Sequence, residues 1–205
     1  MKLLRQFYTA PTLSVAPDLL GKFLVVKTKK SVRNNSSKLA GMIVETEAYI
    51  GQDDLACHAA HGMTKRNEVM FGEAGYAYVY MIYGMYYCLN VVTERAGFPA
   101  AVLIRALEPK EGLEKMAKNR GFSKKDAEIL NLTNGPGKLC QALGIDRKLN
   151  GADLLGNKIW IEDRKIKIRK NEIVRTQRIG VEYAGHCKNY PWRFYIKGNR
   201  FISLR

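Results

Sequence analysis

Residues 76–88, YAYVYMIYGMYYC, constrain the fold more than any other stretch of the 205-residue chain. Every second residue from Tyr76 to Tyr80 is a tyrosine, and smaller apolar residues stand between them, which is the period-two pattern of a half-buried strand. Tyr83 and Gly84 interrupt this pattern, and a second apolar run follows them. Two such runs around a glycine-containing turn predict a β-hairpin, which commits this region to antiparallel pairing.

The tyrosine at the tip of this predicted hairpin is unusual. Turns normally carry Asn, Asp, Gly or Ser, because these residues satisfy the turn geometry and favour water. The plainer interpretation is that the small residues between the strand tyrosines face the core and the rings lie partly exposed. The sharper one is a stacking wall for flat bases, with Tyr83 as a wedge that unstacks a base pair and fills the gap left by an extruded nucleotide.

The rest of the chain predicts further strands and scattered short helices, without a regular βαβ rhythm. Helices are expected in four places: a turn closed by Gly21, residues 110–121, a start at SKKD (123–126), and 134–145 with Pro136 near its start. Strands are expected at 23–27, 39–51, 99–109 and, after residue 152, at 158–163, 165–170 and 193–198, with a hairpin loop at 31–38 and a long ordered loop at 51–75.

This order of elements predicts the α+β class. We expect a single domain over residues 1–205, in which short helices surround a curved, mostly antiparallel β-sheet and one β-hairpin protrudes.

Composition excludes several classes of protein. Hydrophobic residues make up 46% and charged residues 26%, which excludes a disordered chain, and no apolar run approaches the length of a membrane span. The start of the chain lacks the apolar region of a secretory signal. The four cysteines form no CxxC pair, which is typical of a reducing compartment, so we expect a cytoplasmic protein.

The net charge of +15 is unevenly distributed. Residues 147–205 contain 15 Lys and Arg against 5 Asp and Glu, so ten of the excess positive charges lie in this segment. A folded domain this basic indicates a polyanionic partner, most often nucleic acid or a membrane surface. The alternative is a solvated basic face without a partner.

The segment VETEAY could carry chemistry. If the strand is regular, Ile43, Glu45, Glu47 and Tyr49 share one face, and buried carboxylates are costly unless they are paired or in use. Arg105 interrupts the apolar stretch AVLIRALEP and needs an anionic partner, which a strand glutamate would supply. A carboxylate beside an arginine stays ionised, as a general base for water must. The pattern alone leaves both glutamates open, and it also allows an ordinary solvated face.

The cluster Cys57, His58 and His61 could indicate a metal site. A structural zinc site needs a second pair of ligands nearby, and His186 and Cys187 lie far along the chain. We therefore expect no metal, and we expect His58 to be a hydrogen-bonding or stacking wall of a pocket.

The segment TNGPGKL resembles a phosphate loop only superficially. A Walker A motif needs Gly six positions before Lys and Ser or Thr after it, where this chain has Leu132 and Leu139. What remains is a helix start at which Lys138 could contact a nucleic-acid phosphate.

Several long motifs, in the same order along the chain, resemble the alkyladenine (3-methyladenine) DNA glycosylase family in a bacterial-type form. They are LLGKFLV, GMIVETEAYIGQDDLACHA, GMTKRNEVMF, YAYVYMIYGMYYCLNVV, AVLIRALEP, NGPGKLCQALGI, RIGVEYAG and WRFYIKGN. The resemblance implies a monofunctional base-excision repair enzyme that flips an alkylated or deaminated purine out of duplex DNA and hydrolyses its N-glycosidic bond. It implies no cofactor and no lyase activity, and we expect the enzyme to act as a monomer.

The resemblance also implies roles for individual residues. Glu47 resembles the general base that activates water, and Arg105 and the backbone carbonyl of Ile179 resemble its partners in holding that water. The other roles implied are the walls around the flipped base (Tyr49, His58, Tyr80), exclusion of the guanine amino group (Asn90), the intercalating wedge (Tyr83) and contacts to the DNA backbone (Lys138, Arg66).

Two other functions remain open from the residues themselves. A non-catalytic module for damaged DNA would use the same basic face and tyrosine wedge, but it would have no reason to keep an acidic residue beside phosphates. A hydrolase of free nucleosides would need neither the charge of +15 nor an exposed wedge.

Overall fold

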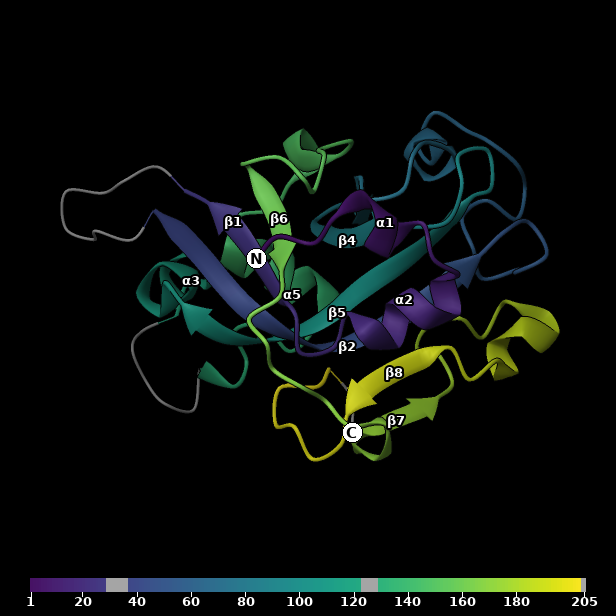
Figure 1. The fold of residues 1–205 in the computed structure, drawn as a ribbon. Coiled ribbons are helices and arrows are strands. Elements are labelled where there is room, and N and C mark those ends of the chain that lie inside the picture. Colours follow the sequence, from purple (N-terminus) through teal and green to yellow (C-terminus); the bar gives the residue numbers. More distant parts are fainter. Residues whose placement is uncertain (29–36, 123–128, 204–205) are drawn as a thin grey trace.

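Two long antiparallel strands, β2 (Lys38–Ile50) and β5 (Ala100–Glu111), form the centre of the structure and cross the whole molecule (Figure 1). The computed structural model describes residues 1–28, 37–122 and 129–203. Most residues of both strands are buried, which explains why apolar residues predominate in their sequences.

The remaining strands extend this central pair into one curled, antiparallel sheet. The order is β3-β4-β5-β2-β1-β6, and β8 pairs with both β2 and β7. The bounds of these strands are β1 (Phe23–Lys27), β3 (Ala77–Ile82), β4 (Tyr86–Val92), β6 (Ile159–Glu162), β7 (Ile173–Thr176) and β8 (Arg193–Ile196). Since β2 pairs with β1 near its start and with β8 near its middle, it holds the N-terminal and C-terminal parts of the chain together.

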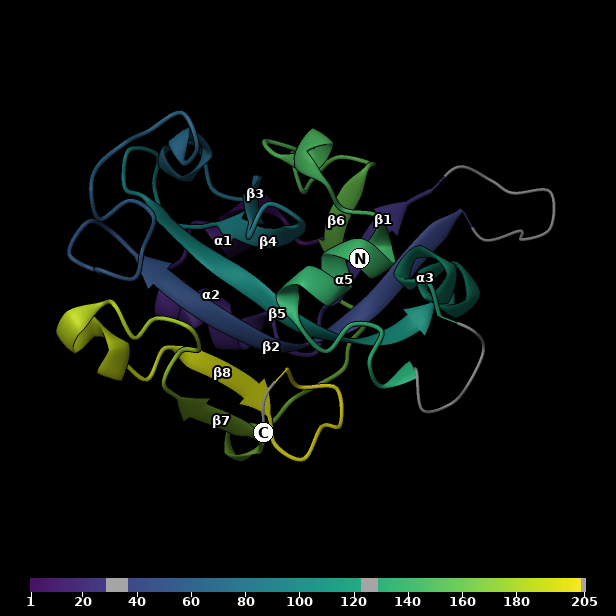
Figure 2. The same cartoon turned by 180° about the vertical axis from the view of Figure 1, so that it is seen from behind.

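Short helices cover both sides of the central strands. One view places α2 (Thr12–Asp18) in front of β2 and β5, and the view from behind places α5 (Pro136–Leu143) there (Figure 2). The other helical segments are α1 (Arg5–Tyr8), α3 (Leu113–Arg120), η1 (Glu68–Phe71), η2 (Arg147–Leu149), η3 (Lys170–Glu172) and η4 (Gly185–Asn189). No helix in the described ranges is long and apolar enough to cross a membrane.

The pairing of β2 with β5 is irregular where the two strands carry their charged residues. Val44 has no partner on β5 and Arg105 has none on β2, because the register shifts on either side of Glu45. Ile43 and Ala48 consequently pack in the same apolar core, although residues five apart in a regular strand point to opposite faces. The prediction that Ile43 shares a face with the glutamates is therefore wrong, since the irregularity changes the alternation.

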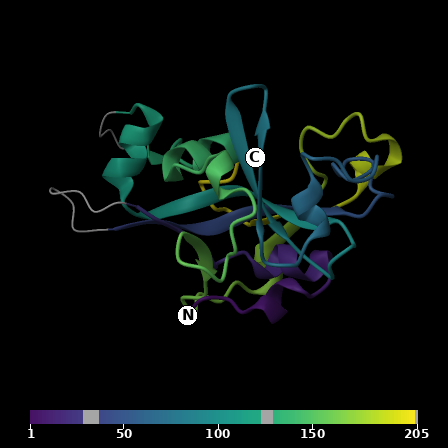
Figure 3. The same cartoon turned by 90° about the horizontal axis from the view of Figure 1, so that it is seen from above.

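The hairpin of β3 and β4 projects from the rest of the molecule (Figure 3). Residues 83–85 connect the two strands, and Tyr83 and Gly84 are the central residues of a tight turn in which the amide of Met85 donates to the carbonyl of Ile82. Both central residues have positive φ (54° and 69°). This is the turn geometry that suits the twist of a hairpin and normally selects Asn-Gly. A tyrosine in the left-handed region costs about 1–2 kcal/mol, so the turn keeps an unfavourable residue at its tip.

Most expected elements are confirmed, including the hairpin. Helix α3 ends at Gly121, α5 begins at Pro136 and ends before Gly144, and both end glycines have positive φ. The strand expected at 165–170 is wrong, because the described chain there pairs with no strand and Lys165 has a φ of 67°. The helix start at 123–126 and most of the loop expected at 31–38 lie outside the described residues.

Candidate active site

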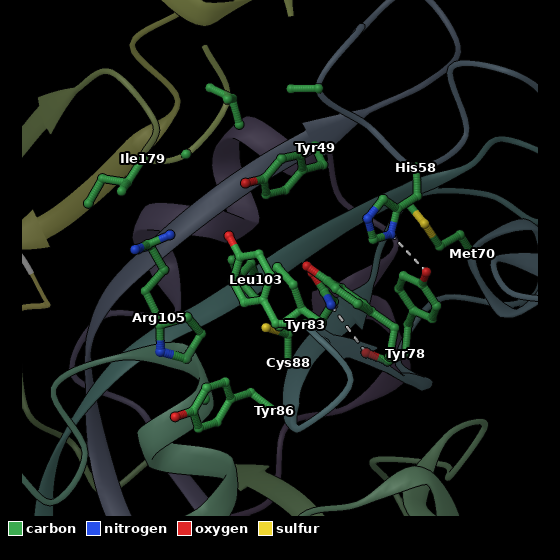
Figure 4. A pocket seen from close by; sticks show the side chains of 18 of the residues that line it. Tyr49, His58, Met70, Tyr78, Tyr83, Tyr86, Cys88, Leu103, Arg105 and Ile179 are labelled. Carbon is green, nitrogen blue, oxygen red and sulfur yellow. Dashed lines mark hydrogen bonds between the residues drawn. The ribbon is translucent and has the colours of Figure 1, made fainter. Parts of the chain in front are cut away.

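A cavity of about 380 Å³ opens beside the projecting hairpin, within the size range of small-molecule sites. Its lining comes from the end of β2, the loop that follows it, the facing strands of the hairpin, the start of α5 and residues 179–183. His58, Met70 and Tyr78 lie on one side, Arg105 and Ile179 on the other, and Tyr49 between them (Figure 4).

Glu47 lies fully buried directly behind this cavity. Its Oε2 accepts hydrogen bonds from the Tyr49 hydroxyl (2.8 Å) and Arg105 Nη1 (3.0 Å), and its Oε1 accepts one from the backbone amide of Ile179 (2.8 Å). All three donors line the cavity. The carboxylate is therefore separated from the cavity only by the groups that hold it.

Arg105 joins the two buried glutamates of β2. Its Nη1 reaches Glu47 and its Nε lies 3.4 Å from Glu45 Oε1, with only 9% of its side chain exposed. Burial alone would lower the pKa of Arg105, but Glu47 and Glu45 outweigh it and the pKa is raised. The arginine remains charged, which confirms the expectation that a strand glutamate would supply its anion.

Glu45 has a different surrounding from Glu47. Its Oε1 accepts from Arg193 Nε (2.7 Å) and the Ser203 hydroxyl (2.9 Å), and its Oε2 accepts from the Ser203 amide (2.6 Å). These partners belong to the C-terminal part of the chain, and neither lines the cavity. Glu45 thus fastens residues 193–203 to the sheet, whereas Tyr49, Arg105 and Ile179, which hold Glu47, all line the cavity.

The hydroxyl that holds Glu47 keeps its own proton. Burial, followed by the negative charge of Glu47, raises the pKa of Tyr49 well above its usual value. Tyr49 is therefore a hydrogen-bond donor to the carboxylate at neutral pH, and its ring lines the cavity.

Three rings form the opposite wall. The centroids of His58 and Tyr80 lie 4.4 Å apart, edge to face, and those of Tyr78 and Tyr80 lie 5.4 Å apart. His58 Nδ1 lies 2.9 Å from the Tyr78 hydroxyl. Because His58 and Tyr80 touch, a flat ligand cannot enter between them, and they present one joint surface.

The wall carries no charge at neutral pH. Burial, and secondarily the nearby Arg66, lowers the pKa of His58 to about 4, and burial raises the pKa of Tyr78 and of Tyr80. Burial also raises the pKa of Cys88, whose thiol lines the cavity beneath the wall. All four groups are therefore uncharged: Cys88 is a thiol, Tyr78 and Tyr80 are phenols, and His58 is a neutral imidazole.

The low pKa of His58 makes folding depend on pH. The unfolded chain protonates this histidine near pH 6.5, and the folded chain only near pH 4, so its contribution is complete above pH 6.5 and is lost as pH falls towards 4. We expect His58→Gln to flatten the decline of the unfolding free energy in that window, measured by denaturant titration. His61→Gln, the same exchange at an exposed position, is the control, and an equal effect of both exchanges would contradict the prediction.

Asn90 lies in the wall formed by the hairpin. It pairs with Tyr78 across the two strands, and its Nδ2 donates to the Tyr78 carbonyl (3.2 Å). Only 4% of Asn90 is exposed, and it lines the cavity. The strand pairing and this hydrogen bond therefore fix the Nδ2 end of the side-chain amide relative to the aromatic wall.

Two basic residues lie near the mouth of the cavity. The guanidinium of Arg66 lies 5.2 Å above the Tyr80 ring and donates to the Met81 carbonyl (3.1 Å). Lys138, in the first turn of α5, donates to Asn134 Oδ1 (2.9 Å), next to the cavity-lining Gly137. Tyr83 stands above this mouth with 82% of its surface exposed.

Comparison with known proteins places the chain in a family. A family model described as Methylpurine-DNA glycosylase (MPG) matches residues 6–200. A protein of Alkaliphilus oremlandii is 52% identical over 211 residues and covers all of both chains, and one of Methanocella arvoryzae is 54% identical over 202 residues, which is 98% of this chain and 95% of the relative. A third, from Legionella pneumophila, is 48% identical over 98% of each chain.

The chain belongs to the methylpurine-DNA glycosylase family. The relatives carry the provisional name of 3-methyladenine DNA glycosylase. Members of a DNA glycosylase family hydrolyse N-glycosyl bonds in DNA, so the chain is a DNA-repair glycosylase.

The glycosylase fold brings most of the sequence-predicted residues to one cavity. Its lining includes seven of them: Tyr49, His58, Tyr80, Tyr83, Asn90, Arg105 and Ile179. Glu47 lies just behind, and Arg66 and Lys138 lie near the mouth. Ile179 contacts Glu47 through its amide, whereas the expectation concerned its carbonyl. The cluster at residues 57–61 forms no metal site, and no group of three possible ligands gathers elsewhere in the described parts of the chain.

The sequence did not indicate Gly137 and Tyr183 as residues of the glycosylase cavity, and it indicated Tyr78 only as part of a stacking face. Tyr78 shares its strand face with Tyr80, so the alternation indicated its place but not its bond to His58. Gly137 lines the cavity because α5 packs against the hairpin, and a Cβ there would lie 3.1 Å from the Tyr86 Cβ. Tyr183, which is 71% exposed, reaches the cavity from a distant loop, and only the tertiary structure reveals it.

Proposed function

We propose that this protein is a monofunctional DNA glycosylase of base excision repair. It flips an alkylated or deaminated purine, of the 3-methyladenine, 7-methylguanine or hypoxanthine class, out of duplex DNA and hydrolyses its N-glycosidic bond. The observation that carries this proposal is the buried, arginine-paired Glu47 immediately behind an aromatic-walled cavity. A charge so completely removed from water is retained where it is paired and in use.

Glu47 serves as the general base for water. A carboxylate oxygen can accept two hydrogen bonds, and within the described residues Oε2 accepts two whereas Oε1 accepts only that of Ile179. Oε1 therefore has capacity for one further donor, which we assign to the attacking water. Arg105 supplies the positive charge that pairs with this carboxylate, and the Ile179 carbonyl is the second proposed acceptor for that water.

The aromatic walls bind the flipped base. Tyr49 covers one face, and the joint surface of His58 and Tyr80 covers the other. A purine alkylated at N3 or N7 is cationic, so each good ring contact adds roughly 0.5–2 kcal/mol. The neutral state of His58 avoids repulsion of that cation. Asn90 discriminates sterically against the amino group of guanine, since it lies buried in the lining of the cavity.

The projecting hairpin opens the duplex. Tyr83 enters the base stack and occupies the space of the extruded nucleotide, while Arg66 and Lys138 contact the DNA backbone. The exposed apolar residues on both sides of Tyr83 support this role, since Met81, Met85 and Tyr86 also lie open to solvent around the tip.

A simple hydrolytic reaction fits the cavity better than a lyase reaction. A lyase needs an amine nucleophile, and no lysine occurs among the described residues that line the cavity.

The four cysteines are free and buried, which supports action in the cytosol. One cavity with one wedge suits a monomer acting on one lesion at a time.

Base release from defined duplexes tests the proposal. We expect the protein to liberate free base from a labelled duplex with one hypoxanthine, or from methylated DNA, and to leave an intact strand with an abasic site. Chromatography of the released base and borohydride trapping of any covalent enzyme–DNA adduct measure both points. Release without trapping is expected. Tight binding without release from any alkylated or deaminated duplex would leave a non-catalytic damage-binding module in its place.

Replacing Tyr83 separates the hairpin's function from its stability. We expect Tyr83→Asn to raise the unfolding free energy by about 1 kcal/mol, because Asn tolerates the left-handed turn, and to weaken lesion-duplex binding about tenfold or more through lost stacking. Denaturant unfolding and duplex titration measure the two effects. Lys165→Asn relieves a similar backbone conformation away from the hairpin and should leave the preference for lesion over undamaged duplex unchanged. Equal loss of preference in both variants would argue against the wedge.

A further inference from the structure

We propose that the buried ion pair between Arg178 and Asp54 positions Glu47 for catalysis by fixing two of its three donors, Ile179 and Tyr49. Neither member of the pair lines the cavity, so both act through the residues they contact. The inference rests on the proposed function of Glu47 as the base.

The pair is rigid and completely enclosed. Arg178 Nη1 lies 2.6 Å from Asp54 Oδ2 and Nη2 lies 2.7 Å from Oδ1, and the side chains are 0% and 1% exposed. Nη1 also donates to the Ala48 carbonyl (2.9 Å) and Nη2 to the Cys187 carbonyl (3.2 Å). Two parallel bonds and two backbone contacts leave the guanidinium one orientation.

Arg178 contacts two of the three donors of Glu47. The residue that follows it is Ile179, whose amide donates to Glu47 Oε1 at 2.8 Å. The guanidinium of Arg178 lies 4.8 Å from the ring centroid of Tyr49, whose hydroxyl donates to Glu47 Oε2. It also lies 5.0 Å from a ring centroid of Trp192. A displacement of Arg178 would therefore shift the Ile179 amide, to which it is bonded in the chain, and the Tyr49 phenol, whose ring it contacts.

Asp54 anchors the same arrangement from the other side. Its Oδ2 accepts from the amide of Ile50, which follows Tyr49, and its Oδ1 accepts from the amide of Ala56, which lines the cavity two residues before His58. The pair thus fastens the end of β2, the loop after it and the loop at 178–181 to one another. Ile179 and Tyr49 both face the cavity from this side (Figure 4).

Positioning and mere structural support make different predictions. If the pair only stabilises the fold, its loss lowers the amount of folded protein but not the rate of each folded molecule. If it positions Glu47, the rate per folded molecule falls, because small displacements of reacting groups are costly, while affinity for the duplex changes little.

Asp54→Asn is the principal test, with Asp153→Asn as a matched control. Asp153 also accepts from an arginine, Arg5 (2.9 Å), and from the amide two residues later, Leu155 (2.9 Å), but its side chain is 38% exposed. We expect Asp54→Asn to lower single-turnover base release per folded molecule by about 10–100-fold, as loss of an orienting partner typically does. Arg178→Lys keeps the charge without the paired bonds and should fall between wild type and Asp54→Asn.

Amide hydrogen exchange of Ile179 provides a readout independent of activity. We expect exchange at this amide to become about tenfold faster or more in Asp54→Asn and to stay unchanged in Asp153→Asn. An unchanged rate per folded molecule in Asp54→Asn, or an equal loss of rate and duplex affinity, would overturn the inference. If wild type releases no base from any duplex, the proposed function fails, and unaltered Ile179 exchange in Asp54→Asn would separately refute the positioning contacts.

Discussion

We expect base release to fall by about 10²–10⁴-fold when Glu47 is replaced by glutamine, the contribution typical of a positioned general base. Glutamine keeps the size of the side chain but cannot take the proton of the attacking water. Binding of the lesion duplex should persist, because Glu47 lies behind the cavity and its walls are unchanged. Single-turnover release and duplex titration with the same substrate measure the two quantities.

Glu45→Gln is the matched control for this experiment. It removes the same charge two residues earlier, from a side chain that is equally buried and also contacts Arg105. Its partners otherwise come from the chain end, so we expect a loss of stability with base release per folded molecule largely preserved. An equal fall in both variants would show that the charge network, and not Glu47 itself, supports the reaction.

The second large effect concerns stability. We expect Arg105→Met to lower the unfolding free energy by about 3–5 kcal/mol, because removing one partner of a buried ion pair leaves its counter-charge uncompensated. Here Glu47 loses its arginine at 3.0 Å, and Glu45 loses the more distant of its two arginines, at 3.4 Å, while it keeps Arg193 at 2.7 Å. Equilibrium denaturation in urea measures the change.

Two further variants make this stability prediction specific. Lys22→Met breaks a more exposed pair with Asp163 (3.0 Å) and should cost no more than about 1 kcal/mol. Adding Glu47→Gln to Arg105→Met removes the buried carboxylate charge that Arg105 no longer pairs. The double variant should therefore recover part of the lost unfolding free energy. Strictly additive effects of the two exchanges would mean that the residues do not interact in the folded protein.

Local sequence signals predicted the elements of this fold well. The alternation around residues 76–82 and the interrupting Gly84 predicted the hairpin, and the end glycines Gly121 and Gly144 marked the ends of α3 and α5. These signals succeed because the alternation of apolar residues and the backbone conformations open to glycine depend on only a few adjacent residues. The alternation at 165–170 misled for the same reason, since a strand also needs a neighbour to pair with, which the segment itself does not reveal.

The site could be predicted only in part. An arginine inside the apolar β5 required an anion, and the glutamates of β2 were the evident source, which the contacts of Arg105 confirm. The residues did not distinguish Glu45 from Glu47, because both stand on the same strand at equivalent spacing. Their difference arises mainly from partners far away in the chain: Ser203 and Arg193 hold Glu45, whereas Ile179 holds Glu47.

The sequence by itself determined the α+β class, the tyrosine hairpin, the need of Arg105 for an anion and, through its motifs, the glycosylase family. Only the tertiary structure decided that Glu47 lies behind the cavity while Glu45 holds the chain end, and that Arg178 meets Asp54 across 124 residues. The physical reason is that propensity and periodicity act between neighbours in the chain. Burial and ion pairing depend on segments that approach one another only when the sheet has curled.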